Sequence, residues 1–452
     1  MNILGSVYFK DFARYFLFLE NTLKNNTESN IHFCYVALYP CAANYLLDNN
    51  AYVHSAYRIR RQEKGRFSLN SHTELVDNLI DFNVKAMSRY GRYERGSLRR
   101  RAITYLNYFD EIFRKENFDL LISSGDSRLL PQVLIYLAKQ YSVPVIYFEQ
   151  GPFGTTTFDS LGVNANSSFD PKLDQLSAEQ RQVLKDRIFR LQNDRPSNYW
   201  KTFKRSPLDK VYDIYTLLCL YPPKVLNRLL PKDLQIGLSF FKFVKSLYGR
   251  GGSRKTNEIA TIAELPKKYI VFFLQVPVDA QLIDHSPYFS DFYEMLVEIF
   301  EAKPAGYNLV IREHPQYRGK YSADLYNYIT RNDICIANDV DLGHLLENAS
   351  VVIVNNSTVG IEALFKGKKV VTLGNSIYSN RGVTFDYHPE TPLAKVINDA
   401  IESSYDKDRL ESFFYSLLVD YLFLGHFQDN NLRIQEEKFL NLVKQKKRVR
   451  AK

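Results

Sequence analysis

The stretch VVIVNNSTVGIEALFKGKKVVTLG, residues 351–374, contains a strand, a turn, a helix, a second turn and a second strand. Val351–Val354 and Val370–Leu373 are short β-branched runs, which favour buried parallel strands. A polar turn and a helical segment lie between them. This unit predicts an α/β fold, because parallel strands connected by a covering helix pack as layers.

The same alternation continues on both sides of this unit. A helical stretch at Leu130–Tyr141 connects two strand candidates in the first half and predicts a parallel βαβ unit. Beyond about Thr391 only helical patterns are found. The remaining predicted strands are Ile31–Leu38, Asp119–Ser123, Pro144–Phe148, Tyr269–Leu274, Leu309–Arg312 and Ile334–Ala337.

The length of 452 residues favours two domains, each with a Rossmann-like sheet, facing a cleft that holds the site. A helical, basic stretch at Pro171–Tyr248 precedes RGGSRKTN, Arg250–Asn257, the best linker candidate. We predict an N-terminal, acceptor-binding domain at 1–255 that includes the basic helical insertion. A C-terminal, activated-sugar-binding domain follows at 256–390, and additional terminal helices with a basic tail occupy 391–452.

The charge of the chain favours anionic partners. The net charge is +9 and the pI is about 9.0. Basic residues cluster at Arg89–Arg101 and at Lys444–Lys452, which suits an anionic membrane surface, although a solvated helix face and a frayed terminus would look the same. No RNP, KH or zinc pattern accompanies these clusters, so we expect no nucleic-acid partner.

The cysteines and the hydropathy pattern indicate where in the cell the protein resides. The four cysteines are scattered without CxxC or Cys/His metal spacing, which indicates a reducing cytosol. No apolar run of 18 residues occurs, and the N-terminal run contains charged residues, which disfavours a signal peptide and a membrane span. We therefore expect a cytoplasmic protein whose membrane contact is peripheral.

The polar turn of the opening stretch is the first candidate site. Ser357 or Thr358 would cap the helix that starts near Val359, so that free backbone N–H groups face a phosphate. Gly360 would allow a ligand to approach closely, and Glu362 could accept hydrogen bonds from ribose hydroxyls. An ordinary helix cap with a surface glutamate is the alternative explanation.

Two further strand ends carry polar residues. His314 and Pro315 follow one strand, where Pro315 stops the strand and His314 could donate to a phosphate oxygen; a turn-forming histidine is the alternative. Gln275, Asp279 and Gln281 follow another strand. Asp279 is a candidate nucleophile or base, or else a turn aspartate that binds its own backbone.

A DxD sequence occurs in NDVD, Asn338–Asp341, and could hold a metal on a diphosphate. Because it directly precedes a helix, we interpret it as a helix cap and expect no metal site. In the first half, polar residues after two strands form a second set of strand-end loops with a predicted role in acceptor binding: Asp126, Arg128, Glu149 and Gly151.

These segments, taken in order, resemble one family: the capsule polysaccharide synthesis proteins of the KpsS and KpsC type, which are retaining β-Kdo transferases, and most nearly the S-type. The resemblance covers roughly residues 118–170 and 268–386. Its matching residues in the second half are Leu274, Gln275, Val276, Asp279, Gln281, His285, Ser286, His314, Pro315, Asn356, Ser357, Thr358, Gly360, Ala363, Leu364, Gly374, Tyr378, Gly382 and Thr384. In the first half they are Gly125, Asp126, Arg128, Phe148–Gly151, Gly162, Val163 and Asn164.

The resemblance implies a GT-B-like fold and a CMP-Kdo donor. It assigns the CMP phosphate to His314, Ser357 and Thr358, the ribose to Glu362, and the catalytic carboxylate to Asp279, which would form a covalent glycosyl adduct. Transfer would need no cofactor, because hydrogen-bond donors can stabilise the leaving phosphate. The chain departs from the family pattern after Phe148, on the predicted acceptor side.

The resemblance also implies a place and partners for the protein. The acceptor would be a lyso-phosphatidylglycerol-like lipid or a glycan, at the inner face of the cytoplasmic membrane and beside other capsule-assembly proteins. Two alternatives stay open. One is another CMP-sugar transferase, such as a sialyltransferase; the other is a non-catalytic, membrane-associated adaptor of a polysaccharide assembly complex.

Overall fold

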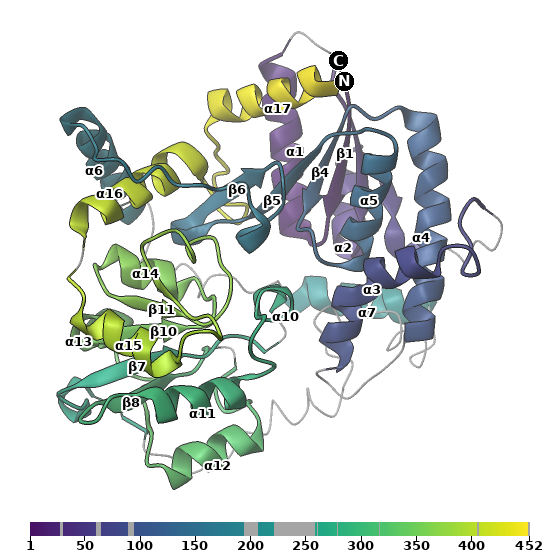
Figure 1. Ribbon diagram of the computed structural model, residues 1–452. Helices are drawn as coiled ribbons and strands as arrows, with labels where there is room; N and C mark the ends of the chain where they lie inside the picture. The colour runs from purple at the N-terminus through teal and green to yellow at the C-terminus, as the bar shows by residue number, and fades with distance from the viewer. Residues whose placement is uncertain are drawn as a thin grey trace. The chain divides into compact units, whose positions relative to one another are not determined.

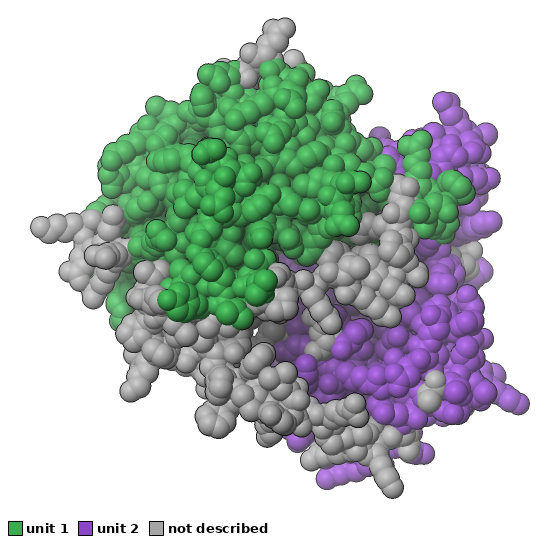
Figure 2. Space-filling view, turned by 180° about the vertical axis from the view of Figure 1, so that it is seen from behind, with its two compact units in different colours: residues 1–168, 188–238, 421–452 green, residues 169–187, 239–420 purple. Residues whose placement is uncertain are grey.

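The structure is a computed structural model that describes residues 1–27, 30–59, 65–88, 95–193, 207–220, 258–259, 261–277, 279–315, 317–404 and 406–450. The chain forms two compact units (Figure 2). Unit 1 consists of residues 1–168, 188–238 and 421–452, and unit 2 consists of residues 169–187 and 239–420.

Unit 1 is built on a seven-stranded sheet with the order β13-β6-β5-β4-β1-β2-β3 (Figure 1). Strands β1 to β5 pair in parallel, whereas β6 and β13 add antiparallel at one edge. The strands are β1 Asn2–Val7, β2 His32–Ala37, β3 Tyr52–Ser55, β4 Leu120–Ser124, β5 Val145–Gln150, β6 Thr155–Asp159 and β13 Phe423–Leu424.

Helices cover both faces of this sheet. Alternate residues of β1 point to opposite faces, so Ile3 belongs to the core beneath α1, α2 and α17, and Leu4 to the core beneath α3, α4 and α5. The helices are α1 Lys10–Asn25, α2 Pro40–Asp48, α3 Thr73–Ser88, α4 Arg95–Glu116, α5 Leu129–Gln140, α7 Pro207–Leu220 and α17 Glu436–Arg450.

Unit 2 is built on a six-stranded sheet with the order β12-β11-β10-β7-β8-β9, and its paired strands are all parallel. Its strands are almost continuously apolar, as expected for a sheet covered on both faces. They are β7 Tyr269–Phe273, β8 Asn308–Arg312, β9 Cys335–Ile336, β10 Val351–Val354, β11 Val370–Thr372 and β12 Phe385–Asp386.

Helices also cover both faces of the second sheet. Helices α10, α11, α12 and α15 pack on one face, around Phe272 and Ile353, while α13 and α14 contact the strands from the other. The helices of this part are α10 Ala280–Asp284, α11 Phe292–Ala302, α12 Ala323–Arg331, α13 Leu342–Asn348, α14 Val359–Phe365, α15 Leu393–Glu402 and α16 Lys407–Tyr415; α6, Ala178–Asn193, begins in unit 2.

The predicted α/β class and the two Rossmann-like sheets are confirmed, including the βαβ unit β4-α5-β5. The predicted strands agree with the observed ones within one or two residues. Strands β1, β3, β6, β12 and β13 were not predicted. Strand β1 contains Gly5, where a Cβ atom would lie 3.0 Å from the Phe16 ring of α1; the glycine makes room for a helix that only the fold brings near.

The predicted boundaries differ from the two units. The segment 169–187, placed in domain 1–255, belongs to unit 2, where Arg181 pairs with Asp408 at 3.0 Å and with Glu411 at 2.5 Å. The terminal segment 391–452 does not stand apart. Helix α15 covers the second sheet, whereas β13 pairs with β6 and returns the chain to unit 1.

Several predictions fall outside the described residues: the linker 250–257, most of 171–248, residues 89–94 and the last two residues of the tail. The described helices α6 and α7 agree with the helical pattern predicted there. No helix in the described ranges is both long and apolar enough to cross a bilayer.

The core beneath α1, α2 and α17 contains a group of aromatic rings around Phe148. Its ring lies 5.3–5.5 Å from those of Phe12, Tyr15, Phe16 and Phe158, and the side chain is 1% exposed. We predict that Phe148→Ala lowers the free energy of unfolding by about 3–5 kcal/mol, because the cavity cannot close. Urea denaturation followed by circular dichroism measures this change. The control Phe189→Ala removes a ring that is 67% exposed and should change little.

Candidate functional site

The chain crosses the second sheet at the boundary between β7 and β10. From β7 it proceeds outward to β8 and β9, and it then returns to β10 and proceeds the other way to β11 and β12. Open parallel sheets bind ligands outside the carboxyl ends of their strands at such a switch point. Gln275 follows β7 and Asn355–Thr358 follow β10, so the sequence-predicted donor residues lie at this point.

Asn356 connects three elements at the switch point. Its Nδ2 donates to the backbone oxygens of Gln281 (2.8 Å) and His285 (3.1 Å), and its Oδ1 accepts from Gln275 Nε2 (2.8 Å). The side chain is 2% exposed. One buried amide therefore ties the end of β10 to the end of β7 and to both ends of α10.

Unsatisfied polar atoms surround this amide. Gln275 Oε1, Gln281 Oε1 and Asn355 Nδ2 are buried and have no hydrogen-bond partner within the described part of the chain. Buried polar groups in native proteins are nearly always hydrogen-bonded. These atoms can therefore accept from, or donate to, a polar ligand or an ordered water.

Asp279 occupies the N-cap of α10. Its carboxylate accepts from Gln281 N at 3.0 Å, and the side chain is half-buried. This is the local hydrogen bond to the backbone that is expected of a turn aspartate, the alternative explanation for Asp279. It does not exclude chemistry, because a carboxylate has further acceptor positions. Since Asn356 holds α10, Asp279 stays fixed at the edge of the same site.

His314 is connected to the site through its backbone. Its N–H donates to the Tyr321 hydroxyl at 3.1 Å, and that hydroxyl donates to Gln275 O at 3.3 Å. Tyr321 thus ties the loop after β8 to the loop after β7. The side chain of His314 is half-buried, and burial lowers the pKa of the imidazole, which favours its neutral form. Pro315, beside it, is exposed.

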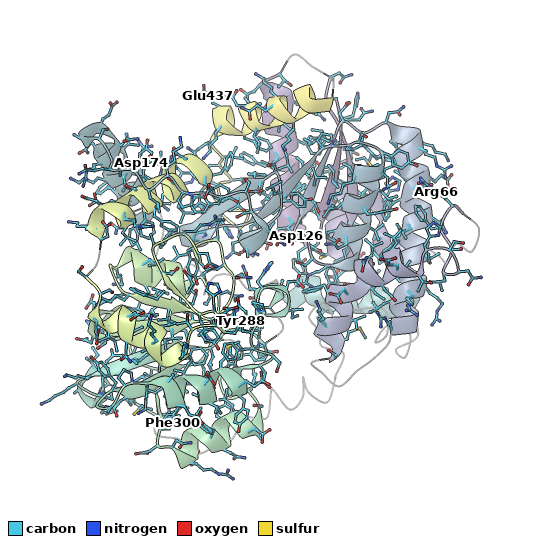
Figure 3. All side chains as sticks on the ribbon, in the orientation of Figure 1. Arg66, Asp126, Asp174, Tyr288, Phe300 and Glu437 are labelled. Carbon is cyan, nitrogen blue, oxygen red and sulfur yellow. The ribbon has the colours of Figure 1, made fainter. Side chains whose placement is uncertain are left out.

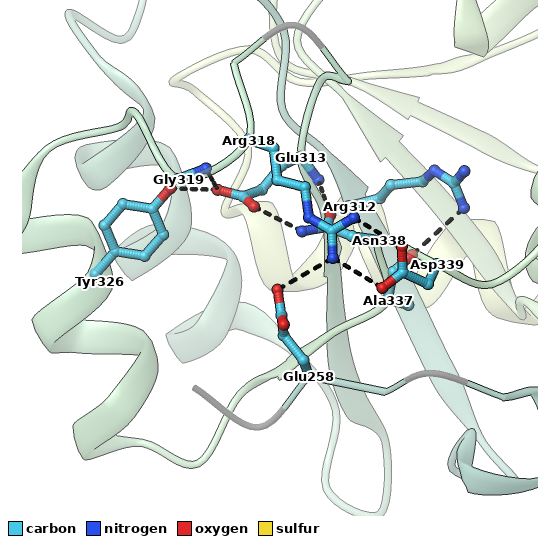
Figure 4. Close-up of polar contacts among 9 residues, drawn as sticks. All are labelled: Glu258, Arg312, Glu313, Arg318, Gly319, Tyr326, Ala337, Asn338 and Asp339. Carbon is cyan, nitrogen blue, oxygen red and sulfur yellow. Dashed lines mark hydrogen bonds and ion pairs between the residues drawn. The ribbon is translucent and has the colours of Figure 1, made fainter. Parts of the chain in front are cut away.

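The loop after β8 is held by a buried carboxylate, Glu313 (Figure 4). Its oxygens accept from the hydroxyl of Tyr326, from Asn338 Nδ2 at 2.6 Å and from Gly319 N at 3.2 Å. Three donors satisfy this buried charge, so that the chain on both sides of His314 and Pro315 is fixed. Glu313 is therefore a positioning residue for this loop.

The DxD carboxylates are both used structurally. Asp339 pairs with Arg318 (2.7 and 2.8 Å), and these bonds lower the pKa of the carboxyl (Figure 4). Asp341 caps α13 by accepting from His344 N at 3.2 Å. The interpretation as a helix cap is confirmed for Asp341. Within the described ranges, no group of three or more His, Cys, Asp or Glu residues could hold a metal ion.

The turn before α14 differs in detail from the prediction. Ser357 Oγ accepts from Val359 N at 3.3 Å, whereas Thr358, at the N-cap position, makes no side-chain cap bond. The structure shows a close approach to Gly360 by a tyrosine side chain. A Cβ atom there would lie 2.3 Å from the hydroxyl of Tyr378, which donates to Ser357 O at 2.5 Å. Gly360 makes room for this tyrosine, which holds the turn from behind.

Glu362 lies in the first turn of α14 and is half-buried. Burial raises the pKa of its carboxyl to about 7, and nearby Lys366 opposes the shift. The side chain is therefore close to its titration point at neutral pH. Such a group can accept or donate a hydrogen bond with little cost for either state, so it is not the ordinary surface glutamate of the alternative explanation.

The acceptor-side candidates lie in unit 1, where Asp126 (Figure 3) follows β4 at the corresponding switch point between β1 and β4. Asp126 is 8% exposed, and its carboxylate accepts from Val163 N (3.1 Å) and Asn166 Nδ2 (3.0 Å). It therefore anchors the loop 162–166. These two hydrogen bonds give the Asp126 carboxylate a structural role in the loop.

The other three candidates follow β4 and β5. Arg128 precedes α5, and its guanidinium lies 5.8 Å from the rings of Tyr8 and Phe82. Glu149 is half-buried at the end of β5, and its Oε2 would lie 3.9 Å from a Cβ atom at Gly125. Gly151 donates its N–H to Thr155 O at 2.9 Å and so forms the β5-β6 turn.

Sequence reasoning missed the residues that hold the site together. Tyr321, Tyr326 and Glu313 support the loop of His314, and Tyr378 supports the turn of Ser357. In a chain with 32 tyrosines, nothing in the local sequence distinguishes Tyr321 and Tyr326. Tyr378 is a matching residue of the family resemblance, but its contact with Gly360 arises only in the fold.

The fold and these strand-end loops define a class: an α/β protein with two Rossmann-like units, each carrying polar residues at its switch point. Residues 120–423, more than half of the chain, match the model of a family described as capsule polysaccharide biosynthesis protein. The chain belongs to this family, so the predicted family resemblance is confirmed.

Individual relatives differ in their sequence identity to this chain and in the length of the match. The capsule polysaccharide export protein KpsS of Escherichia coli is 25% identical over 296 residues, which cover 62% of this chain and 72% of KpsS. Protein FixF of Sinorhizobium fredii is 35% identical over 130 residues, 28% of this chain, and the match spans 31% of the length of FixF. The β-Kdo 2,4 transferase structure of Thermosulfurimonas dismutans KpsC has a TM-score of 0.40 and 12% identity, with 73% of this chain and 88% of that chain covered.

We predict that Asn356→Ala lowers the free energy of unfolding by about 2 kcal/mol, because Gln275 Nε2 and two backbone oxygens lose their partner in a buried place. Urea denaturation measures the change. The control Asn348→Ala removes an exposed amide that bonds His344 O at 3.0 Å. An equal loss in both variants would contradict the role of Asn356.

Glu362 should make the stability of the folded protein depend on pH. Its pKa in the folded state is about 7, above the usual value of 4.5. Between these values the unfolded chain has lost the proton that the folded chain keeps, so stability falls as the pH rises through this window. We predict that Glu362→Gln removes this fall and is the more stable protein at pH 8, by on the order of 2 kcal/mol.

Thermal unfolding from pH 4.5 to pH 8 tests the prediction for Glu362. The matched control is Glu298→Gln, the same substitution at an exposed position of α11. Parallel stability curves for wild type and Glu362→Gln across the whole range would show that the carboxyl is not the titrating group.

Proposed function

We propose that the protein is a glycosyltransferase that moves Kdo from CMP-Kdo to a lipid or glycan acceptor, with retention, in capsule polysaccharide synthesis. The observation that carries the proposal is the set of buried hydrogen bonds from Asn356 to Gln275 and Gln281 at the switch point of unit 2. It occurs in a chain of the capsule polysaccharide biosynthesis family. The ordered motifs around this cluster, which resemble those of β-Kdo transferases, suggest the sugar.

The donor would bind at the carboxyl edge of the second sheet. A neutral imidazole at His314 can donate one hydrogen bond to the CMP phosphate, and Ser357 and Thr358 can supply hydroxyl and backbone donors. The unsatisfied oxygens of Gln275 and Gln281 can accept from sugar hydroxyls. Glu362 would face the ribose. Because α14 has only seven residues, we give these side chains more weight than the helix dipole.

Asp279 would be the nucleophile. Its carboxylate attacks the anomeric carbon of Kdo, the bond from that carbon to the phosphate oxygen breaks, and CMP leaves with the electron pair. The acceptor hydroxyl then attacks the same carbon, loses its proton, and releases the Asp279 carboxylate. Two inversions give net retention. No cofactor is needed, because hydrogen-bond donors stabilise the charge of the leaving phosphate.

The acceptor would bind to unit 1, at loops that Asp126 and Gly151 shape and where Arg128 and Glu149 supply charge. A lyso-phosphatidylglycerol-like lipid suits the net charge of +9, and so does a peripheral position on the inner face of the cytoplasmic membrane, beside other assembly proteins. A sialyltransferase-like activity is the nearest rival. Direct competition between CMP-Kdo and CMP-sialic acid in one assay distinguishes the two donors.

We predict that Asp279→Asn lowers the transfer rate by ~10³-fold or more, because an amide cannot form the glycosyl ester. Asparagine caps helices about as well as aspartate, so α10 should persist. The assay follows CMP release and the gain of one Kdo mass on a lyso-phospholipid. It also searches for the glycosylated Asp279 peptide by mass spectrometry when the acceptor is omitted.

The matched control is Asp284→Asn, the same substitution on an exposed residue at the other end of α10. It should leave the rate within about twofold of wild type. If Asp279→Asn keeps more than a tenth of the wild-type rate, Asp279 is not the nucleophile. If wild type transfers nothing from CMP-Kdo or from CMP-sialic acid to any acceptor while it still supports capsule assembly, the result favours the adaptor role.

A further inference from the structure

Helix α7, Pro207–Leu220, packs against α2 in unit 1 (Figure 1). An amphipathic helix on a globular protein normally buries its apolar face and exposes its charges. In α7 both carboxylates contact the rest of unit 1, whereas the side chains of Leu208, Val211 and Tyr215 are exposed. Both the carboxylate contacts and the exposed apolar side chains therefore require an explanation.

The inward side of α7 makes specific polar contacts. Asp213 is fully buried, and its carboxylate accepts from Cys41 N at 2.7 Å and from the Cys41 thiol at 3.1 Å. Cys41 lies in the first turn of α2, so Asp213 caps that helix from outside. One turn earlier, Asp209 pairs with Lys10 at 3.6 Å. These contacts fix the rotation of α7 about its axis.

The outward side is an apolar stripe. Leu208, Val211, Tyr212 and Tyr215 are spaced three, four and seven residues from the first, which places them on one helix face. They are 79%, 62%, 41% and 68% exposed, respectively. We call these four residues the α7 stripe. Exposed apolar residues that gather on one helix face usually mark an interaction surface.

The surroundings of the α7 stripe are basic. Lys10 lies beside Asp209 and Tyr45, and its side chain is 45% exposed. In the sequence, KTFKRS, residues 201–206, immediately precedes α7 with three basic and no acidic residues. Leucine, valine and tyrosine on one face next to basic residues are the composition of helices that lie in the interface of anionic bilayers.

The position of α7 relates this surface to the candidate acceptor loops. Helix α2 starts just after β2, so Asp213 meets it at the carboxyl edge of the first sheet. Asp126 and Glu149 follow β4 and β5 at the same edge, because these strands are parallel to β1 and β2. A bilayer that receives the α7 stripe would therefore lie on the side of unit 1 that carries these loops.

A second copy of the chain is a poorer occupant. Four side chains on one helix give much less than the roughly 800 Å² per partner of a stable protein interface. A net charge of +9 on each copy also opposes association, whereas the same charge favours an anionic surface.

We infer that the α7 stripe is a membrane-docking surface that inserts into the interface of a bilayer rich in anionic phospholipid. The inference rests on the membrane-peripheral part of the proposed function and assigns that contact to one helix. It does not depend on the donor or on Asp279, since docking needs no reaction.

The experiment measures co-sedimentation of the full chain with vesicles of phosphatidylglycerol and phosphatidylcholine. Wild type should bind them, and binding should fall as the salt concentration rises. Leu208→Ser together with Val211→Ser should weaken the partition coefficient by about tenfold or more. The matched control is Val183→Ser with Phe189→Ser on α6, which removes side chains that are 40% and 67% exposed; it should bind as wild type does.

Three outcomes would overturn the inference. Wild-type binding by the double α7 variant, with an unchanged unfolding temperature, shows that the α7 stripe is not the docking surface. Equal binding to vesicles of phosphatidylcholine alone shows that anionic lipid is not recognised. A concentration-dependent dimer in sedimentation equilibrium that the α7 variant abolishes, without vesicle binding, assigns the stripe to a second copy. Absence of Kdo transfer with intact docking would reject the proposed function and leave the inference standing.

Discussion

The second unit depends on one buried amide. Parallel strands end together at one edge of their sheet, but nothing in the sheet itself fixes the loops that follow them. Asn356 does so, because its amide can donate two hydrogen bonds and accept others, and here it reaches β7, β10 and both ends of α10. A smaller or purely accepting side chain could not make the same three connections. The positions of Gln275, Gln281 and Asp279 follow from it.

Around this amide, tyrosines and a carboxylate act as supports. Tyr321 connects two loops, Tyr378 holds the Ser357 turn through the gap that Gly360 provides, and Glu313 fixes the His314 loop with three donors. Glu313 and Tyr378 are buried and Tyr321 is half-buried, and all three are hydrogen-bonded, whereas several buried amide atoms of the site itself have no partner within the described residues. The contrast separates residues that build the site from residues that can still bind a ligand.

Much of the fold could be predicted from the hydrophobic pattern of the sequence. The strands of the second half could be predicted because each is a short apolar run, buried on both faces. Strands β1, β6 and β13 could not, since Gly5, a run of threonines and a two-residue strand carry little pattern of their own and are stabilised by neighbours distant in sequence. The same reason explains the boundaries: the return of β13 to β6 joins residues more than 260 positions apart.

The sequence by itself determined the α/β class, the family and the order of the polar strand ends, because hydrophobic period and motif spacing are properties of the chain alone. Only the tertiary structure decided which of those polar groups meet. It joined Gln275 to Asn356, placed the Tyr378 side chain against Gly360, and raised the pKa of Glu362 by burial. It also left Leu208, Val211 and Tyr215 of α7 exposed. Contacts, desolvation and helix rotation depend on what packs alongside, and sequence position does not contain that information.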